Sequence, residues 1–125
     1  MPVRVVEIER VYDHPGAEPG FRVFADRLWP RGLRKDAFHY DDWAKDLAPS
    51  RELRRWYGHD VAEFAEFRSR YLAELESPGG RTAVERVLEL AGDRSIVLLT
   101  ATKDVEHSHA EVLRDFLTDL LRESA

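Results

Sequence analysis

Ser95–Thr100 has the sequence SIVLLT, a continuous apolar run between a Gly-Asp turn and a polar segment. A short apolar run bounded in this way is typical of a strand that is buried on both faces of a sheet. Val3–Val11 and Phe21–Ala25 are rich in Val, Ile or Phe and predict two further strands. Asp13–Gly20, which joins them, contains two Pro and two Gly and is short for a helical crossover. We therefore expect these two strands to be antiparallel or not adjacent.

Helical periodicity dominates the rest of the chain. Ser50 is placed to cap a helix that ends near Tyr57, with Gly58 as its C-cap. A Ser, Thr or Asp three residues before a Glu has the capping-box spacing, which predicts the start of a helix. This spacing precedes three further predicted helices, at Asp60, Thr82 and Ser108. A short helical turn is expected around Asp41–Asp46.

Strands that alternate with helices predict a layered α/β fold. We expect one small domain over residues 1–125, with a mixed or mostly parallel sheet of few strands flanked by helices. A length of 125 residues suits a single hydrophobic core. The irregular stretch Trp29–Pro49 is long for a loop in so small a domain, which is typical of a functional or partly helical segment.

The composition excludes several classes of protein and site. The chain has no cysteine, which excludes disulfides, thiolate zinc sites and a cysteine nucleophile. The N-terminal sequence lacks the apolar core of a signal peptide, and no run approaches the roughly 18 apolar residues of a membrane span. We therefore expect a cytoplasmic protein with no membrane partner. The formal net charge of −5 argues against duplex nucleic acid as a partner, although it leaves room for a local basic patch.

Two segments concentrate residues that are suited to chemistry. Asp26–Leu33 (DRLWPRGL) and Thr100–His109 (TATKDVEHSH) each follow a predicted apolar strand. Ligands of open α/β sheets bind beyond the carboxyl ends of the strands. If the two strands are parallel neighbours, both segments emerge at the same edge of the sheet. The side chains brought together would then be Asp26, Arg27, Arg31, Lys103, Asp104, His107 and His109.

This group predicts a pocket for a small anionic ligand. Its three cations are Arg27, Arg31 and Lys103. The N-terminal amides of the last helix would add to them, and such a site suits a phosphate or a carboxylate. Trp29 is expected to form an apolar wall of the pocket. The alternative is structural: the cations pair with Asp26 and Asp104, and the tryptophan anchors the core.

The carboxylates and imidazoles would support an enzymatic role for the same site. Asp26 or Asp104 would act as nucleophile or general base, and His107 or His109 as general acid or base. A helix cap or a hydrogen bond to a loop carbonyl is the structural alternative for either histidine. The H-x-H pair lacks the further ligands of a metal motif, so we assign neither a metal nor a cofactor.

The strings RVYD, DRLWPRGL, DLAPS, ELRRWYGHD and LLTATKDVEHSHAEVL occur in this order along the chain. Their order and spacing resemble the YeaO-like branch of the family called domain of unknown function 488. The resemblance implies a small α/β bacterial protein without a settled activity. In the wider family the late motif often carries a Cys-His-Arg cluster, whereas here the region holds Lys103, Asp104, His107 and His109. A cysteine-based mechanism is therefore not carried over.

Three functions remain open at this point. The first is a hydrolase or transferase that acts on a small phosphorylated or nucleotide-like anion. The second is a non-catalytic module that binds an anionic metabolite in the same pocket. The third is a nucleic-acid-associated regulatory protein, for which the chain shows no helix-turn-helix pattern. Relatives have been labelled methyltransferases, but no Gly-rich cofactor loop follows the first strand. The sequence carries no signal for the oligomeric state.

Overall fold

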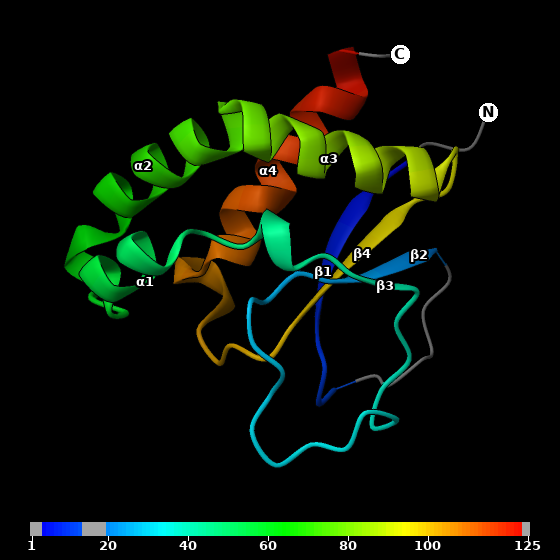
Figure 1. Cartoon of the computed structure of the whole chain (residues 1–125), viewed down its shortest axis with the longest axis horizontal. Coiled ribbons are helices and arrows are strands. Elements are labelled where there is room, and N and C mark those ends of the chain that lie inside the picture. The colour runs from blue at the N-terminus through cyan, green and yellow to red at the C-terminus, as the bar shows by residue number, and fades with distance from the viewer. Residues whose placement is uncertain (1–3, 14–19, 124–125) are drawn as a thin grey trace.

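The structure is a computed structural model that describes residues 4–13 and 20–123. Within these residues, the centre of the fold is one sheet of four parallel strands in the order β1-β4-β2-β3 (Figure 1). The strands are β1 (Val6–Arg10), β2 (Phe21–Phe24), β3 (Asp42–Trp43) and β4 (Ile96–Thr100). Val3 of the first predicted strand and residues 14–19 of the predicted loop lie outside the described residues. The expected small layered α/β fold is confirmed.

β4 is the central strand and pairs in parallel with β1 on one side and β2 on the other. All five of its residues are buried, as its apolar sequence predicted. β1 and β2 are not adjacent, which was one of the two expected alternatives, because β4 lies between them. Phe24 is the register partner of Leu99, so β2 and β4 end side by side at one edge of the sheet. This is the arrangement that the predicted site requires.

The helices of the described residues cover one face of the sheet. The α-helices are α1 (Arg51–Tyr57), α2 (Phe64–Glu76), α3 (Pro78–Ala91) and α4 (His109–Glu123), and the 3-10 helices are η1 (Lys45–Leu47), η2 (Val61–Glu63) and η3 (Val105–His107). α4 contacts both the sheet and α2, and the main hydrophobic core lies among these elements (Figure 1). No helix in the described part of the chain is long and apolar enough to cross a membrane.

The other face of the sheet is covered by the loop between β2 and β3 instead of a helix. Phe24, Val97 and Leu99 form a second small core with Phe38, and Trp29 packs against it. The rings of Trp29 and Phe38 are stacked, with centroids 4.9 Å apart. The long irregular segment that the sequence predicts after Trp29 therefore has a structural role: it covers this face of the sheet and shields its apolar side chains from water.

A buried ion pair holds this loop against the sheet. The Arg22 guanidinium lies 3.2 Å from the Glu9 carboxylate, and the two side chains are 2% and 7% exposed. Nε of Arg22 also donates to the carbonyl of His39 at 2.9 Å, and its backbone amide donates to Asp41 at 2.8 Å. β1, β2 and the end of the loop are thereby joined through one side chain.

α1 begins and ends as predicted. The hydroxyl of Ser50 accepts a hydrogen bond from the amide of Leu53 at 3.2 Å, and Gly58 has a φ of 51°, a left-handed conformation typical of a C-cap. Asp60 does act as a cap, but it caps the short helix η2 through the amide of Ala62, and α2 follows η2 directly. The short helical turn expected around Asp41–Asp46 is present as η1, but it begins only at Lys45, because β3 occupies Asp42–Trp43.

Two predicted capping boxes do not form among the described residues. α3 begins at Pro78 instead of Thr82, because the hydroxyl of Ser77 accepts from the amide three residues later and proline is favoured in a first helical turn. α4 begins directly after Ser108, as expected, but the hydroxyl of Ser108 donates to the carbonyl of Val105. The capping-box spacing therefore predicted the start of α4 correctly but not the start of α3. The predicted side-chain cap is observed in neither helix.

Candidate functional site

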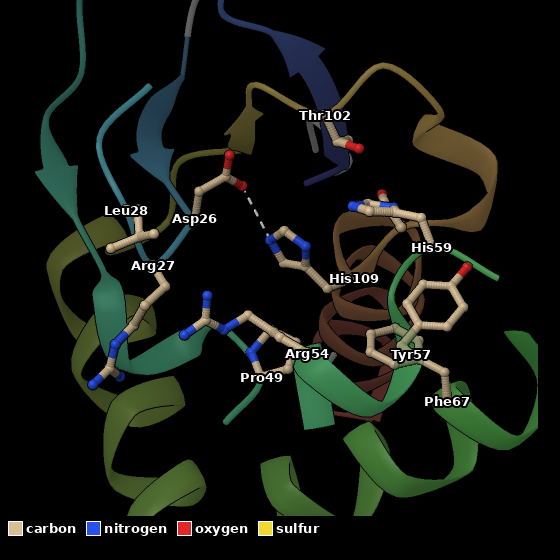
Figure 2. Close-up of a pocket in the computed structure, with 11 residues that line it drawn as sticks. Asp26, Arg27, Leu28, Pro49, Arg54, Tyr57, His59, Phe67, Thr102 and His109 are labelled. Carbon is tan, nitrogen blue, oxygen red and sulfur yellow. Dashed lines mark ion pairs between the residues drawn. The ribbon is translucent and has the colours of Figure 1, made fainter. Parts of the chain in front are cut away.

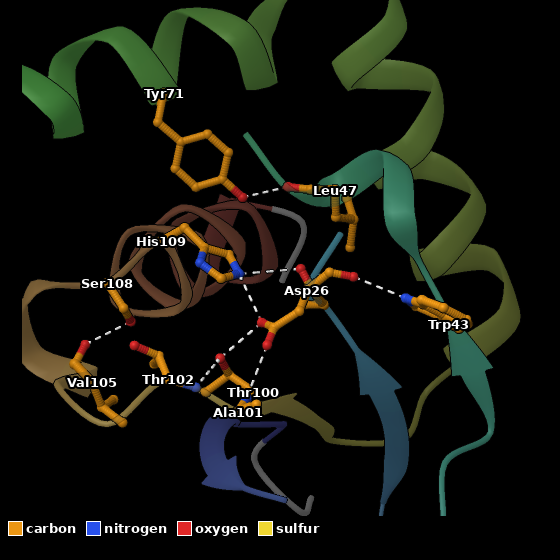
Figure 3. A network of polar contacts seen from close by, with 11 residues as sticks. Asp26, Trp43, Leu47, Tyr71, Thr100, Ala101, Thr102, Val105, Ser108 and His109 are labelled. Atoms are coloured by element: carbon orange, nitrogen blue, oxygen red, sulfur yellow. Dashed lines mark hydrogen bonds and ion pairs between the residues drawn. The ribbon is translucent and has the colours of Figure 1, made fainter. Parts of the chain in front are cut away.

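The carboxyl ends of β2 and β4 meet at Asp26, which stands two residues after the end of β2. One oxygen of its carboxylate accepts from the hydroxyl of Thr100 at 2.8 Å, and the other accepts from the amide of Ala101 at 2.9 Å. Nε2 of His109, the first residue of α4, lies 3.1 Å from the first of these oxygens (Figure 3). The indole of Trp43 donates to the Asp26 carbonyl at 2.8 Å. Two strands and a helix thus fix this one residue.

The surroundings of Asp26 keep its carboxyl group ionised. Burial by itself raises the pKa, but the hydrogen bond and charge of His109, the amide of Ala101 and the hydroxyl of Thr100 outweigh it. The pKa is therefore lowered from its ordinary value of 3.8. The group is a carboxylate near neutral pH, and its oxygens are already engaged by three donors.

The neighbours of His109 determine which ring nitrogen carries the proton. Nε2 lies 3.1 Å from Oδ1 of Asp26 and also 3.1 Å from the carbonyl oxygen of Ala25. Both neighbours are acceptors, so Nε2 must donate, and in the neutral ring Nδ1 holds the lone pair. The ring of Tyr71 packs edge-on against the imidazole, while its hydroxyl donates to the carbonyl of Leu47 (Figure 3).

A cavity of about 310 Å³ opens beside this pair (Figure 2). Its lining residues are Asp26, Arg27, Leu28, Pro49, Arg54, Tyr57, His59, Phe67, Thr102, Ser108 and His109. The cavity is thus built from the ends of β2 and β4, from α1 and α2, and from the N-terminus of α4. A helix N-terminus favours anions because its amides and dipole are positive.

Among the described residues, the cavity lining contains two guanidinium groups, of Arg27 and Arg54, and one carboxylate, of Asp26. Arg27 is 48% exposed and lies 4.0 Å from Asp46, an ion pair of little strength at the surface. Arg54 lies on α1, and its Nε atom is buried without a hydrogen-bond partner in the described part of the chain. Figure 2 shows both side chains on the same side of the Asp26–His109 pair. A buried donor without a partner is costly, so this position favours an acceptor on a ligand or a water molecule.

The chain is similar in sequence to known proteins over most of its length. Residues 5–125 match the family described as the inactive DUF488-N3 subclade. The chain belongs to this family. It is 43% identical over 112 residues to the uncharacterized protein Rv3073c of Mycobacterium tuberculosis, covering 90% of this chain and 92% of that protein. It is 39% identical over 118 residues to the uncharacterized protein YeaO of Escherichia coli, covering 92% and 98% of the two chains. No solved structure matches the chain.

The structure brings only part of the predicted site together. Asp26, Arg27 and His109 line the cavity. Arg31 and Lys103 are exposed and are not among its described lining residues. The three expected cations therefore do not form one cluster. The backbone turns away after Asp26 and carries Arg31 with it, since the loop has to cover the second face of the sheet.

The remaining predicted site residues have other surroundings. Nδ1 of His107 lies 2.9 Å from the carboxylate of Asp104, and its ring meets Phe64 edge-on. Trp29 packs in the second core, where its indole donates to the carbonyl of Leu33 at 2.8 Å. His107 and His109 thus pair with different carboxylates. No group of three or more metal-ligating side chains occurs within residues 4–13 and 20–123.

Two cavity residues lie outside the predicted site, because their sequence patterns are typical of structural positions. Arg54 belongs to ELRRWYGHD, where nearby acidic residues are typical of a solvated helix, and His59 precedes a predicted helix start, which is typical of a turn residue. His59 does have a left-handed φ of 60°, but it also lines the cavity. A signal for Arg54 was present, because residues three apart share a helix face and Tyr57 is an aromatic residue on that face.

Proposed function

We propose that this protein binds a small anionic metabolite in the cavity beside Asp26 and His109 and does not transform it. The observation that carries the proposal is the Arg54 side chain, which lines the cavity and whose Nε atom has no hydrogen-bond partner among the described residues. Arg27 and the start of α4 add positive potential on the same side. A phosphate or carboxylate would supply the acceptor that Arg54 lacks.

Hydrogen bonds that occupy three candidate nucleophiles of the cavity lining support a role without catalysis. Asp26 has both oxygens engaged by donors. Burial and the charges of Asp104 and Asp60 raise the pKa of Tyr57, and its hydroxyl donates to the carbonyl of His107 at 2.6 Å. The hydroxyl of Ser108 is buried and donates to Val105. The family description, an inactive subclade, agrees with a binding role.

A hydrolase or transferase acting on the same anion is the second candidate. The contact between Asp26 and His109 favours it, because a carboxylate on one ring nitrogen orients the other as a general base. Such an enzyme would have to activate a water molecule or a hydroxyl of the substrate. Steady turnover of a phosphate monoester by the wild type, abolished in His109→Gln, would replace the binding proposal with this one.

Isothermal titration calorimetry with inorganic phosphate, AMP and ribose 5-phosphate tests the binding proposal. We expect weak, saturable binding of at least one of these anions by the wild type. Arg54→Ala should lose at least about tenfold in affinity, the usual effect of removing a charged hydrogen-bond partner. Lys103→Ala is the matched control, because Lys103 is exposed outside the cavity lining and should leave the affinity unchanged. No binding of any of the three anions by the folded wild type would refute the proposal.

The proposal also specifies what the protein should not bind. A cavity of about 310 Å³ admits a small metabolite but not a nucleic-acid duplex. The net charge of −5 opposes association with duplex DNA at physiological salt. A gel shift that survives competitor DNA and moderate salt would revive the regulatory interpretation.

A further inference from the structure

We infer that the ligand of this cavity carries a free hydroxyl group in addition to its anionic group, as a sugar phosphate does. The inference rests on the proposed function and names the class of anion. In this arrangement the hydroxyl donates a hydrogen bond to Nδ1 of His109 while the anionic group accepts from Arg54. An anion that has only acceptor oxygens can accept from Arg54, but it has no hydrogen to donate to Nδ1 of His109.

The argument starts from the side of His109 that faces Asp26. Nε2 has two acceptors at 3.1 Å, the carboxylate of Asp26 and the carbonyl of Ala25, and so it must carry a hydrogen. The lowered pKa of Asp26 means that this carboxylate does not supply a competing proton near neutral pH. Nδ1 is therefore an acceptor in the neutral imidazole, the form that is studied when binding is measured well above the reference histidine pKa of about 6.5.

The next step concerns where Nδ1 points. Figures 2 and 3 both show this nitrogen on the side of the ring away from Asp26. Within the described residues no donor forms a hydrogen bond with Nδ1. The His109 side chain is 17% exposed, and Nδ1 is not among the fully buried atoms without a partner, so a ligand or a water molecule can reach it.

The hydroxyl of Tyr57, which lines the same cavity, is not free to act as this donor. This hydroxyl is committed to the carbonyl of His107 at 2.6 Å. The positive groups of the lining, Arg27 and Arg54, suit the anionic part of the ligand. A ligand hydroxyl is thus the group that complements Nδ1, and the two requirements together select hydroxylated anions over simple ones.

The test compares ribose 5-phosphate with methyl phosphate, a monoester with the same anionic group and no hydroxyl. Calorimetry of the wild type should show about tenfold tighter binding of ribose 5-phosphate, the effect of one hydrogen bond to a partly buried acceptor. In His109→Gln the side-chain amide can still donate to Asp26, but the acceptor at the Nδ1 position is lost. The ratio of the two affinities should then fall close to one. Lys103→Ala, outside the cavity lining, should keep the wild-type ratio.

The outcomes separate the inference from the proposed function. Equal affinities for the two phosphates in the wild type would overturn the inference and leave anion binding intact, whereas binding of neither would overturn both. A second measurement does not depend on any variant folding. Nitrogen-15 magnetic resonance of the histidine rings records the chemical shift of Nδ1 of His109. Ribose 5-phosphate should move this shift toward the value of a hydrogen-bonded nitrogen, and methyl phosphate should not. An identical response to both ligands would also overturn the inference.

Discussion

Nε2 of His109 lies 3.1 Å from Oδ1 of Asp26, so the first residue of α4 is tied to a residue just beyond the end of β2. The two residues are far apart in sequence and meet because β4 places α4 beside the end of β2. The pair joins the sheet to the helix layer and forms one side of the cavity. Its removal should therefore affect both stability and ligand binding.

Asp26→Asn should destabilise the fold by about 1–3 kcal/mol. The asparagine amide presents a donor where the native carboxylate accepts from three donors, so at least one donor loses its partner. Urea unfolding followed by circular dichroism measures the change. Asp104→Asn is the control, because Asp104 is 50% exposed and its loss should cost little. Equal losses of unfolding free energy in the two variants would show that Asp26 is no more important to stability than an exposed aspartate.

Stability should also depend on pH through Asp26. The pKa of this group is lowered in the folded protein from the ordinary 3.8, so its contribution is fully present above that value and disappears as the pH falls through the folded-state pKa. The difference in unfolding free energy between the wild type and Asp26→Asn should therefore be constant near neutral pH and shrink in strongly acidic solution. Urea titrations of both proteins across this range measure it. A difference that grows in acid would show the opposite sign of the pKa shift.

Removing one partner of the buried pair between Glu9 and Arg22 should be strongly destabilising. Arg22→Met leaves the Glu9 carboxylate buried without its cation, which costs about 3–5 kcal/mol. The double variant Glu9→Leu with Arg22→Met should recover much of this loss, because it removes both charges. Chemical denaturation measures both variants against Arg31→Ala, which removes an exposed arginine and should cost little. If the double variant is as unstable as Arg22→Met, the unpaired Glu9 carboxylate is not the cause of the destabilisation.

Phe67→Ala should cost about 3–5 kcal/mol of unfolding free energy. Phe67 is 2% exposed and stacks on Tyr57 with ring centroids 4.2 Å apart. The substitution should also enlarge the cavity, since Phe67 is one of its lining residues. Leu90→Ala is the control, because Leu90 is 45% exposed on α3. Thermal unfolding of the two variants should show a large loss for the first and a small change for the second.

Gly79 and Gly80 should respond to alanine with opposite signs. A Cβ at Gly80 would lie 2.2 Å from the carbonyl oxygen of Glu74 and 2.7 Å from Cα of Leu75, so alanine there forces α2 and α3 apart. Nothing lies within 4 Å of a Cβ at Gly79, where alanine should stabilise the helix by about 0.5–1 kcal/mol. Calorimetric melting temperatures of the two variants measure the contrast. A stable Gly80→Ala protein would show that the junction between the helices can relax.

The candidate site was predictable in part. Asp26 and His109 were identified because each stands after a strand or at the start of a helix, and both positions follow from local patterns. Arg31 and Lys103 were expected beside them, but the structure leaves both outside the described cavity lining. Arg54 was missed because a helical arginine has the same sequence pattern whether it faces solvent or a cavity. Which of these it faces depends on where the helix packs.

The sequence by itself determined the elements whose causes are local. The apolar run of β4 and the cap of α1 at Ser50 with its end at Gly58 depend on neighbouring residues only, and all are observed as predicted. The tertiary structure alone decided the strand order and the contact between Asp26 and His109. Each of these depends on burying apolar surface between segments distant along the chain. Many local patterns are compatible with several such packings, and the free energy of the whole core selects one.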